Sequence, residues 1–483
     1  MFWGVVMYKK PDKRQITIED FFLPFGGKLS ADNDWIKLAG LMPWDMIEDI
    51  YMKKFKNDKT DGRPPISSRI AFGSLFIKSR KHLTDEFTLE LISENPYMQY
   101  FLGLREFRQE LLFDISMMVH FRKRFTDEEI SQINEELYRR MNPTKEDDDT
   151  QGNDFKEGEE AKEIENKGNL ILDATVAPSD VRYPTDLSLL NECRENIEKI
   201  IDGIWEQTER VGHKTPYNRK KARKSYLRVA KQRKPRKKQL KQSISEQLEY
   251  VEKGLLVLEK LRQEIPVEAL DKRQNERIGV IQRVAKQQRT HIEDPKAKID
   301  DRIVNLRQSH VRPIVRGKAG AAVEFGQKVT FSVVDRYTFI EKQSWDNFNE
   351  GITLIDSVMK YKERHGFFPE AIMADTIYRT RENRKFCKDN GIRLSGPRLG
   401  RPKKDEIERD KEQSYIDSCK RNIVESRNGI VKRKYGMNRI LTYLNCTSKT
   451  EVAMAVLAMN VGLHLKELLC LIFRKCIRLK CRV

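Results

Sequence analysis

The strongest constraint on the fold of this 483-residue chain is that its β-strand pattern is interrupted by a long helical block. NLILDATV, residues 169–176, is a short run of apolar and β-branched residues, which is typical of a buried strand. Between Leu187 and about Asp301 the apolar residues recur at helical spacing, and strand pattern resumes only at Val311. The chain is therefore expected to form a mixed α/β sheet whose first strand is followed by a helical insertion.

Three acidic residues occupy comparable positions in the element order that follows. The pattern predicts strands near 322–334, 338–343 and 370–375, with helices at 346–364 and 378–390. Asp173 lies near the end of the first strand, and Asp375 ends the fourth. A carboxylate in a buried strand is costly unless it is paired or bound to a metal ion.

The third acid, Glu425, lies in the stretch KEQSYIDSCKRNIVESRNGIVKRKY, residues 411–435. In a helix, Arg421, Glu425 and Lys432 fall within roughly 40° of one another. The opposite face is predicted to be an apolar stripe of Ile416, Cys419, Ile423 and Ile430. An acid between two cations suits a metal ion and the phosphates it bridges. The alternative is an ordinary Arg/Glu pair on a solvated helix face.

The charge of the chain favours an anionic partner. The net charge is +19 and 34% of the residues are charged. Nucleic acid is the first candidate, and a basic surface that binds nothing is the alternative. At this length two or more domains are expected.

A basic stretch, residues 219–241, lies between the helices of the insertion and contains no acidic residue. Lys220, Lys221 and Arg223 are predicted to contact phosphates, which would make binding steeply salt-dependent. The alternative is a solvated basic linker. The flanking helices are expected to pack as a hairpin or a short coiled coil.

The N-terminal part, residues 32–142, is predicted to be all-α. Ser67 or Ser68, Thr84 and Thr126 stand where N-caps belong, and Thr126 with Glu129 reads as a capping box. Arg122 and Lys123 are candidate phosphate contacts. A helix-turn-helix variant and a purely structural or dimerising bundle both remain open. The acidic segment 143–167 that follows is expected to be a linker.

Other features argue against a secreted or membrane protein. The seven cysteines include no CxxC pair, which favours a reducing cytosol over a disulfide framework. The most apolar run, residues 452–473, contains Asn460 and His464 and is expected to be a buried helix rather than a membrane span. The first ten residues are too few for a signal peptide, so a cytoplasmic protein is predicted.

The spacing Arg421-x3-Glu425-x6-Lys432 resembles the Y-R-E-K signature of bacterial insertion-sequence DDE transposases. The tyrosine of that signature would fall at Ser418, with Tyr415 one turn earlier. Residues 70–104 with 117–125 are similar to the N-terminal domain of this family, and residues 378–404 are similar to its block after the second acid. The resemblance covers most of the chain from 32 to 443.

This resemblance implies an RNase H-like catalytic core, with Asp173, Asp375 and Glu425 as catalytic residues and as ligands of two Mg²⁺ or Mn²⁺ ions. It implies cleavage of transposon ends and joining to target DNA, by a homodimer or higher oligomer associated with the bacterial nucleoid. The implied DNA contacts are Arg421, Lys432, Arg379, Arg381, Arg398 and Arg401. Charge alone adds Lys220, Lys221, Arg223, Arg122 and Lys123 as predicted contacts.

The predicted class is therefore an α+β multidomain protein. The expected layout is an N-terminal arm (1–31), a helical domain (32–142), an acidic linker (143–167), a core (168–187 and 311–445), the helical insertion (188–310) and a C-terminal helical tail (446–483). A transposase-derived DNA-binding protein without catalysis is the main alternative. A helical RNA-binding or scaffolding protein is the second.

Overall fold

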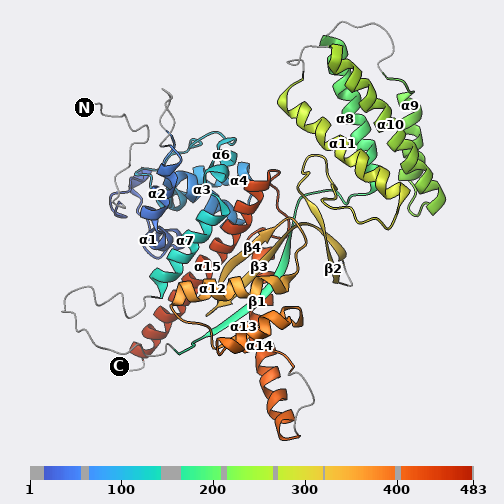
Figure 1. Ribbon diagram of the computed structural model, residues 1–483. Helices are drawn as coiled ribbons and strands as arrows, with labels where there is room; N and C mark the ends of the chain where they lie inside the picture. The colour runs from blue at the N-terminus through green and yellow to red at the C-terminus, as the bar shows by residue number, and fades with distance from the viewer. Residues whose placement is uncertain are drawn as a thin grey trace, which may run out of the picture. The chain divides into compact units, whose positions relative to one another are not determined.

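A computed structural model describes residues 16–55, 65–142, 165–207, 215–264, 270–318, 321–397 and 404–480. The acidic segment falls largely outside these ranges. The chain divides into two compact units (Figure 1). The first comprises Met1–Pro178, Lys328–Ser344 and Phe348–Val483, and the second comprises Ser179–Gln327 with Trp345–Asn347. This division into two units does not test the six-part layout expected from the sequence, which remains a prediction.

The N-terminal helices of the first unit begin where the sequence places their caps. The side chains of Ser67, Thr84 and Thr126 accept hydrogen bonds from backbone N–H groups one turn on, and Thr126 with Glu129 forms the predicted capping box. Each cap satisfies a donor that the helix itself leaves unpaired. The helices are α1 (Asp34–Leu41), α2 (Trp44–Lys53), α3 (Ser68–Lys81), α4 (Asp85–Glu94), α5 (Pro96–Phe101), α6 (Met117–Arg124) and α7 (Asp127–Met141).

The last helix, α15 (Asn445–Lys480), is buried on two sides within the first unit. Met454, Leu457 and Val461 pack into the core of the N-terminal helices, whereas Val456 and Met459 pack into the core beside the sheet. This double burial explains why the stretch is so apolar. No described helix is long and apolar enough to cross a membrane.

A buried polar cluster joins α15 to its neighbours. The side-chain amide of Asn460 donates to Asn134 Oδ1 at 2.9 Å and to the backbone carbonyl of Thr338 at 2.7 Å. Its oxygen accepts from the backbone N–H of Thr338 at 3.1 Å. Asn460 therefore pairs its polar atoms inside an otherwise apolar core, as a buried amide must.

The six-stranded sheet has the order β2-β3-β1-β5-β6, and β4 pairs with β3. β1–β5 and β5–β6 are parallel, whereas β2–β3 and β3–β4 are antiparallel, so the predicted mixed sheet and α+β class are confirmed. The strands are β1 (Asn169–Pro178), β2 (Arg312–Lys318), β3 (Ala321–Val334), β4 (Tyr337–Ser344), β5 (Ala371–Met373) and β6 (Arg393–Leu394).

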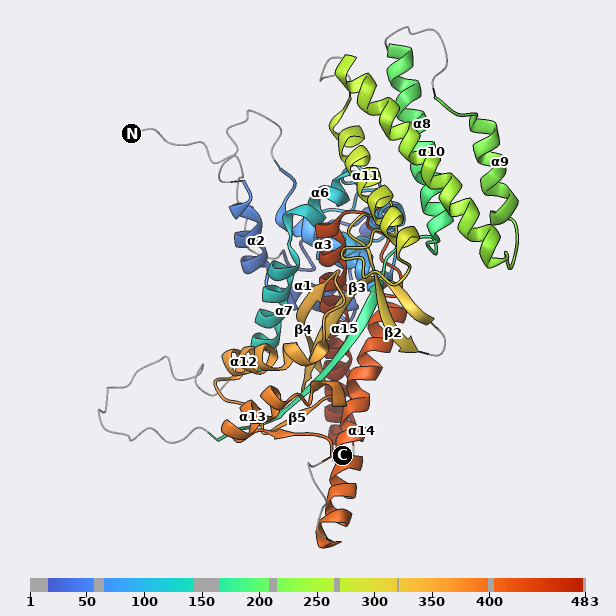
Figure 2. The same ribbon diagram turned by 45° about the vertical axis from the view of Figure 1, so that its right-hand side comes forward.

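Three further helices of the first unit lie against the parallel strands: α12 (Leu354–His365) contacts β1, α13 (Arg381–Asp389) contacts β6, and α14 (Lys404–Lys434) contacts both β1 and β5. Figure 2 shows α14 running beside β1. Gly168, just before β1, has φ +78°, and a Cβ there would lie 2.5 Å from the Tyr361 hydroxyl oxygen. Only glycine fits this entry into the strand without strain.

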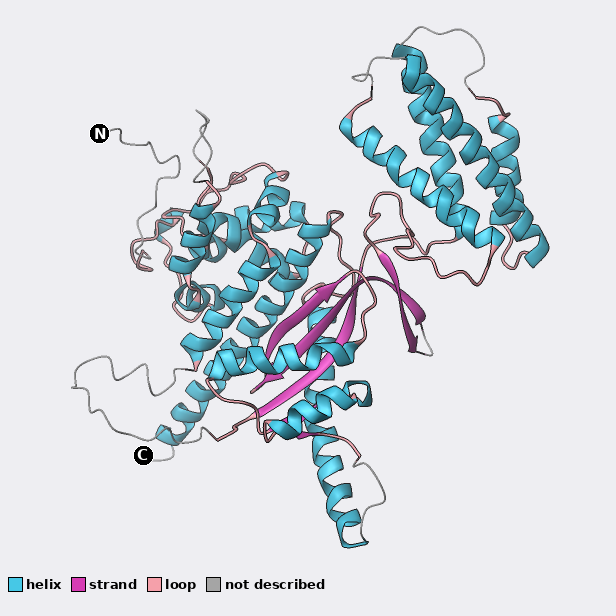
Figure 3. Ribbon diagram, in the orientation of Figure 1, coloured by secondary structure: helices cyan, strands magenta, loops and turns pink. Residues whose placement is uncertain are grey.

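The second unit is mainly helical and also contains β2 and the first part of β3 (Figure 3). Its helices are α8 (Asp186–Gln207), α9 (Arg219–Ala230), α10 (Lys237–Glu264) and α11 (Lys272–Glu293). α10 packs against each of the other three, and a core that includes Ile197, Ile201, Leu248 and Ile281 lies among them. The helical character predicted for this part of the chain is confirmed.

Candidate active site

The two aspartates are aligned by the pairing of β1 with β5. The parallel register matches Asn169 with Ala371, Leu170 with Ile372 and Ile171 with Met373. Asp173 and Asp375 each come two residues after the last matched pair. Neighbouring strands of a parallel sheet lie about 4.8 Å apart. The register therefore places the two carboxylates at the same level.

The two carboxylates differ in their surroundings. Asp173 is half-buried. It lies in the middle of β1, since the strand continues to Pro178 rather than ending soon after the acid. Asp375 lies just beyond β5, where its Oδ1 accepts from the backbone N–H of Thr376 at 2.6 Å and caps the short helix η4 (Thr376–Tyr378). Its side chain is 56% exposed.

Helix α14 supplies the third acid and an arginine between the acids. Arg421 Nη1 lies 3.6 Å from Asp375 Oδ1, and its Nη2 lies 3.7 Å from Glu425 Oε1. One turn further along α14, the Asn428 side-chain amide donates to Asp173 Oδ2 at 2.8 Å. One face of α14 thus touches both strand acids and presents Glu425 beside them.

The buried face of α14 is not the predicted one. Val424 and Val431 are fully buried, whereas Ile416 is 39% exposed and Cys419 is exposed. Ile423 and Ile430 are only partly buried against the same core. The prediction named the wrong side of the helix as the buried one. The helical period shows that apolar residues share a side, but interactions with the sheet decide which side faces the core.

One such interaction is an ion pair between Asp417 and Arg393, at the start of β6. The guanidinium donates from Nη1 to Oδ2 at 2.6 Å and from Nη2 to Oδ1 at 2.9 Å. Burial opposes ionisation of Asp417, but the hydrogen bonds from Arg393 and Gln413 outweigh it and hold the pKa of Asp417 below its ordinary value. Sequence analysis missed this pair, although a carboxylate on the inner side of a helix was the available signal.

The acids also act on a buried phenol nearby. Burial raises the pKa of Tyr378 well above its ordinary value, and the negative charges of Glu350, Asp173 and Asp375 raise it further. The phenol is therefore neutral at neutral pH.

The remaining cations predicted near the acids are placed differently. Lys432 is half-buried on α14, and Arg381 is exposed at the start of α13. Arg379 donates to the backbone carbonyls of Leu394, Ser395 and Pro397, so its guanidinium holds the chain after β6. Arg398 and Arg401 lie outside the described residues.

Arg122, predicted to contact DNA, is buried instead. It is 5% exposed, and its guanidinium makes two hydrogen bonds to the Asp85 carboxylate, at 2.8 and 2.6 Å. Lys78 lies 3.1 Å from the same carboxylate and 2.8 Å from that of Glu451. Arg122 is therefore part of the interior, whereas its neighbour Lys123 is exposed. Lys220, Lys221 and Arg223 are all exposed on α9, in the second unit.

The donor set fits a divalent cation in kind, since carboxylate oxygens are the ligands that Mg²⁺ prefers. The Arg421 guanidinium lies within 4 Å of two of the carboxylates, where it places a positive charge between them. Within the described ranges, no three acidic, histidine or cysteine side chains already converge as ligands of one metal ion. Metal binding would therefore require the carboxylates to turn toward one another.

Fold and site together define an α+β protein with an acidic site where β5 ends beside β1. Two family models match the chain: a transposase DDE domain over residues 372–462 and a transposase domain, DUF772, over residues 24–124. Both matches support the predicted resemblance to insertion-sequence DDE transposases. Asp375 and Glu425 lie inside the first match, and Asp173 lies outside both.

A curated relative, an uncharacterized protein, ORF8 in the nfe locus of Rhizobium meliloti, is 31% identical over 98 residues. The match covers 20% of this chain and 46% of the relative, so the chain spans about half the length of that protein. No solved structure matches. Transposases of the DDE type act on DNA and generally use divalent metal ions.

Proposed function

We propose that this protein is an active DDE transposase that cleaves the ends of an insertion sequence and joins them to target DNA. The observation that carries the proposal is the meeting of Asp173, Asp375 and Glu425, from two neighbouring strands and one helix, around Arg421 and Asn428. An RNase H-like core is the fold we assign to the sheet and α14.

Asp173, Asp375 and Glu425 would hold two Mg²⁺ or Mn²⁺ ions. Such ions, when bound, stabilise the charge on the attacking and leaving oxygens of an in-line displacement at phosphorus. Asn428 keeps the Asp173 carboxylate turned toward α14, and Arg421 fixes the spacing of Asp375 and Glu425. A bound cation would then draw the three carboxylates toward one another.

The first reaction is hydrolysis at the transposon end. A water oxygen bonds to the scissile phosphorus, and the bond from phosphorus to the 3′ oxygen breaks, leaving a 3′ hydroxyl on the element. In the second reaction that hydroxyl oxygen attacks a target phosphorus and displaces the target 3′ oxygen. Arg421 and Lys432 would hold the neighbouring phosphates, because a guanidinium and an ammonium suit such contacts. Arg381 would extend this surface, and Lys123 would meet DNA from the N-terminal helices. Arg398 and Arg401, outside the described residues, stay predicted phosphate contacts.

We further propose that the protein acts on the bacterial nucleoid, as a homodimer or higher oligomer that brings both element ends together. A second candidate is a transposase-derived DNA-binding protein without catalysis. It is favoured by Ser418, which stands where the signature has tyrosine. Tyr415, one turn earlier, is 72% exposed.

The test is nicking of a duplex that carries the terminal sequence of the element, with Mg²⁺ or Mn²⁺. We expect nicking by the wild type and a loss of about 10³-fold or more in Asp173→Asn, Asp375→Asn and Glu425→Gln. Glu412→Gln removes an exposed carboxylate from the same helix and should leave the rate unchanged. End-specific binding without nicking under any divalent ion would establish the second candidate instead.

A further inference from the structure

The outer face of α9, in the second unit, is another strongly charged surface, and it carries none of the three acids. Every lysine and arginine from Lys220 to Lys241 is exposed, and no acidic residue interrupts the stretch. Ala222 and Val229 are buried and define the inner side of α9. At 100° per residue, Lys220, Arg223 and Lys224 fall on the outer half of the helix, and Lys221 lies at its edge.

Two arginines of α9 lie close to acids of the neighbouring helices. Arg219 donates to both carboxylate oxygens of Asp202, at 2.9 and 2.8 Å, and Arg228 lies 3.8 Å from Glu246. Within the described part of the chain, Lys220, Lys221, Arg223 and Lys224 pair with no acid. Their charges therefore face solvent uncompensated.

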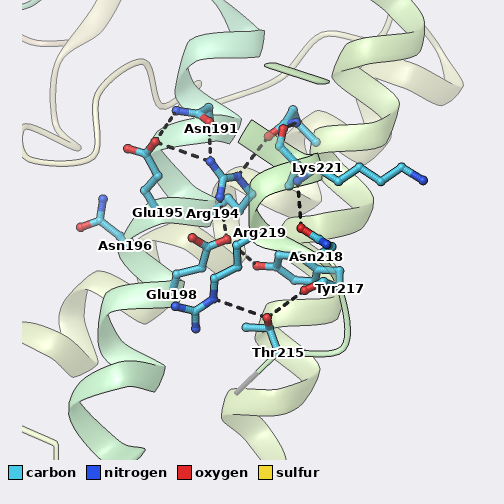
Figure 4. Close-up of polar contacts among 12 residues, drawn as sticks. Asn191, Arg194, Glu195, Asn196, Glu198, Thr215, Tyr217, Asn218, Arg219 and Lys221 are labelled. Atoms are coloured by element: carbon cyan, nitrogen blue, oxygen red, sulfur yellow. Dashed lines mark hydrogen bonds and ion pairs between the residues drawn. The ribbon is translucent and has the colours of Figure 1, made fainter. Parts of the chain in front are cut away.

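A buried network fixes α9 in this orientation (Figure 4). Arg194, on α8, is 2% exposed and donates to Glu198 at 2.6 Å, to Asn191 at 2.8 Å and to Gln247 at 3.3 Å. Gln247, on α10, in turn donates to the backbone carbonyl of Ala222 at 3.0 Å. The inner side of α9 is thus tied to both neighbouring helices.

The start of α9 is held in the same network. The Tyr217 hydroxyl donates to Glu198 Oε1 at 3.2 Å, and Asn218 caps the helix by accepting from the Lys221 N–H at 3.0 Å. Arg194, Gln247 and Glu198 therefore hold the position and orientation of α9, the helix that displays the cations.

We infer that the outer face of α9 binds the phosphate backbone of duplex DNA, without reading its sequence. Lysine and arginine contacts to phosphates carry affinity but little sequence information. Tyr226, the one aromatic residue between 219 and 241, is half-buried, so the described surface offers no exposed ring on which an unpaired base could stack. This favours a duplex over a single strand. The choice of DNA over RNA rests on the proposed function.

The test uses the full chain with Asp173→Asn, so that DNA is bound and not cut, in the absence of divalent ions. The variant Lys220→Gln/Lys221→Gln/Arg223→Gln/Lys224→Gln is compared with Lys272→Gln/Arg273→Gln/Arg283→Gln/Lys286→Gln. The second set removes the same charge from exposed positions on α11. Circular dichroism checks that both variants fold as the parent does, which exposed substitutions permit.

We expect the α9 variant to bind element-end and scrambled duplexes equally poorly, about tenfold or more below the parent near 0.1 M salt. Its log affinity should also fall less steeply with log salt, by about 0.9 for each phosphate that the variant no longer neutralises. The α11 variant should stay within about threefold of the parent.

Equal losses in the two variants, or no loss in the α9 variant, would overturn the inference. Tighter binding of duplex RNA than of duplex DNA would overturn the choice of partner. Nicking by the otherwise wild-type chain is measured separately with Mg²⁺. If the wild-type chain nicks DNA but the α9 variant binds normally, only the α9 surface is refuted. If the wild-type chain does not nick DNA but the α9 variant shows the expected binding losses, only the catalytic proposal is refuted.

Discussion

The side-chain amide of Asn428 donates a hydrogen bond to Oδ2 of Asp173, with 2.8 Å between the two atoms. This bond joins α14 directly to β1. It sets how far α14 is turned about its own axis, so that Glu425, one turn earlier, lies on the side of the strand acids.

Replacing Asn428 should therefore weaken catalysis more than DNA binding. We expect Asn428→Ala to lower the nicking rate about 10- to 100-fold, because groups that orient a metal-binding carboxylate commonly have effects of this size. Single-turnover nicking and duplex affinity measured on the same preparation separate the two effects. Asn422→Ala changes an exposed amide of the same helix and should alter neither. A normal rate in Asn428→Ala would remove Asn428 from the site.

Arg421 is expected to affect metal affinity and catalysis in opposite directions. Its guanidinium lies 3.6 Å from Asp375 and 3.7 Å from Glu425, so it competes with a cation for both carboxylates. Arg421→Gln should bind Mn²⁺ more tightly, by a few-fold, yet nick DNA about 10²-fold more slowly, since glutamine cannot hold a phosphate as a guanidinium does.

Mn²⁺ titration without DNA and single-turnover nicking at saturating Mn²⁺ check this pair of effects. Arg421→Lys should not restore the rate, because an ammonium cannot bridge two groups in the way a planar guanidinium can. Weaker Mn²⁺ binding in Arg421→Gln would contradict the assigned competition.

Arg122 should matter for stability and Lys123 should not. Arg122→Met leaves the Asp85 carboxylate with Lys78 as its remaining cation, in a partly buried position. We expect a loss of about 2 kcal/mol in the free energy of unfolding, measured in urea. Lys123→Gln, at an exposed position, should stay within about 0.5 kcal/mol of the parent. Unchanged stability with weakened DNA affinity in Arg122→Met would restore the original prediction of a phosphate contact.

The ion pair of Asp417 with Arg393 should stabilise the protein in a pH-dependent way. The pKa of Asp417 is lowered in the folded protein, so its contribution is present above the pKa of the unfolded chain, near 3.9. That contribution is lost as the pH falls through the lower folded value. Asp417→Asn should therefore be less stable than the parent at pH 7, and the difference should shrink below about pH 4.

Urea midpoints measured across this pH range check the last prediction. Asp389→Asn, at an exposed position, serves as the control and should follow the parent at every pH. A difference between Asp417→Asn and the parent that does not change with pH would show that the ion pair contributes nothing through its charge.

The sequence by itself determined what depends on near neighbours along the chain. The helix caps at Ser67, Thr84 and Thr126, the strand at 169, the helical block and the Arg421–Glu425 spacing are all local, because caps, turns and periodicity act within a few residues. The two aspartates were visible as acids in or after apolar strands for the same reason.

Only the tertiary structure decided which distant groups meet. The β1–β5 register aligns Asp173 with Asp375, Asn428 reaches Asp173 and Arg393 turns α14 through Asp417. Arg122, which looks like a surface cation in the sequence, is buried against Asp85. Such interactions join residues far apart in the chain, and packing selects them among many partners of the same chemical type, so no local pattern could specify them.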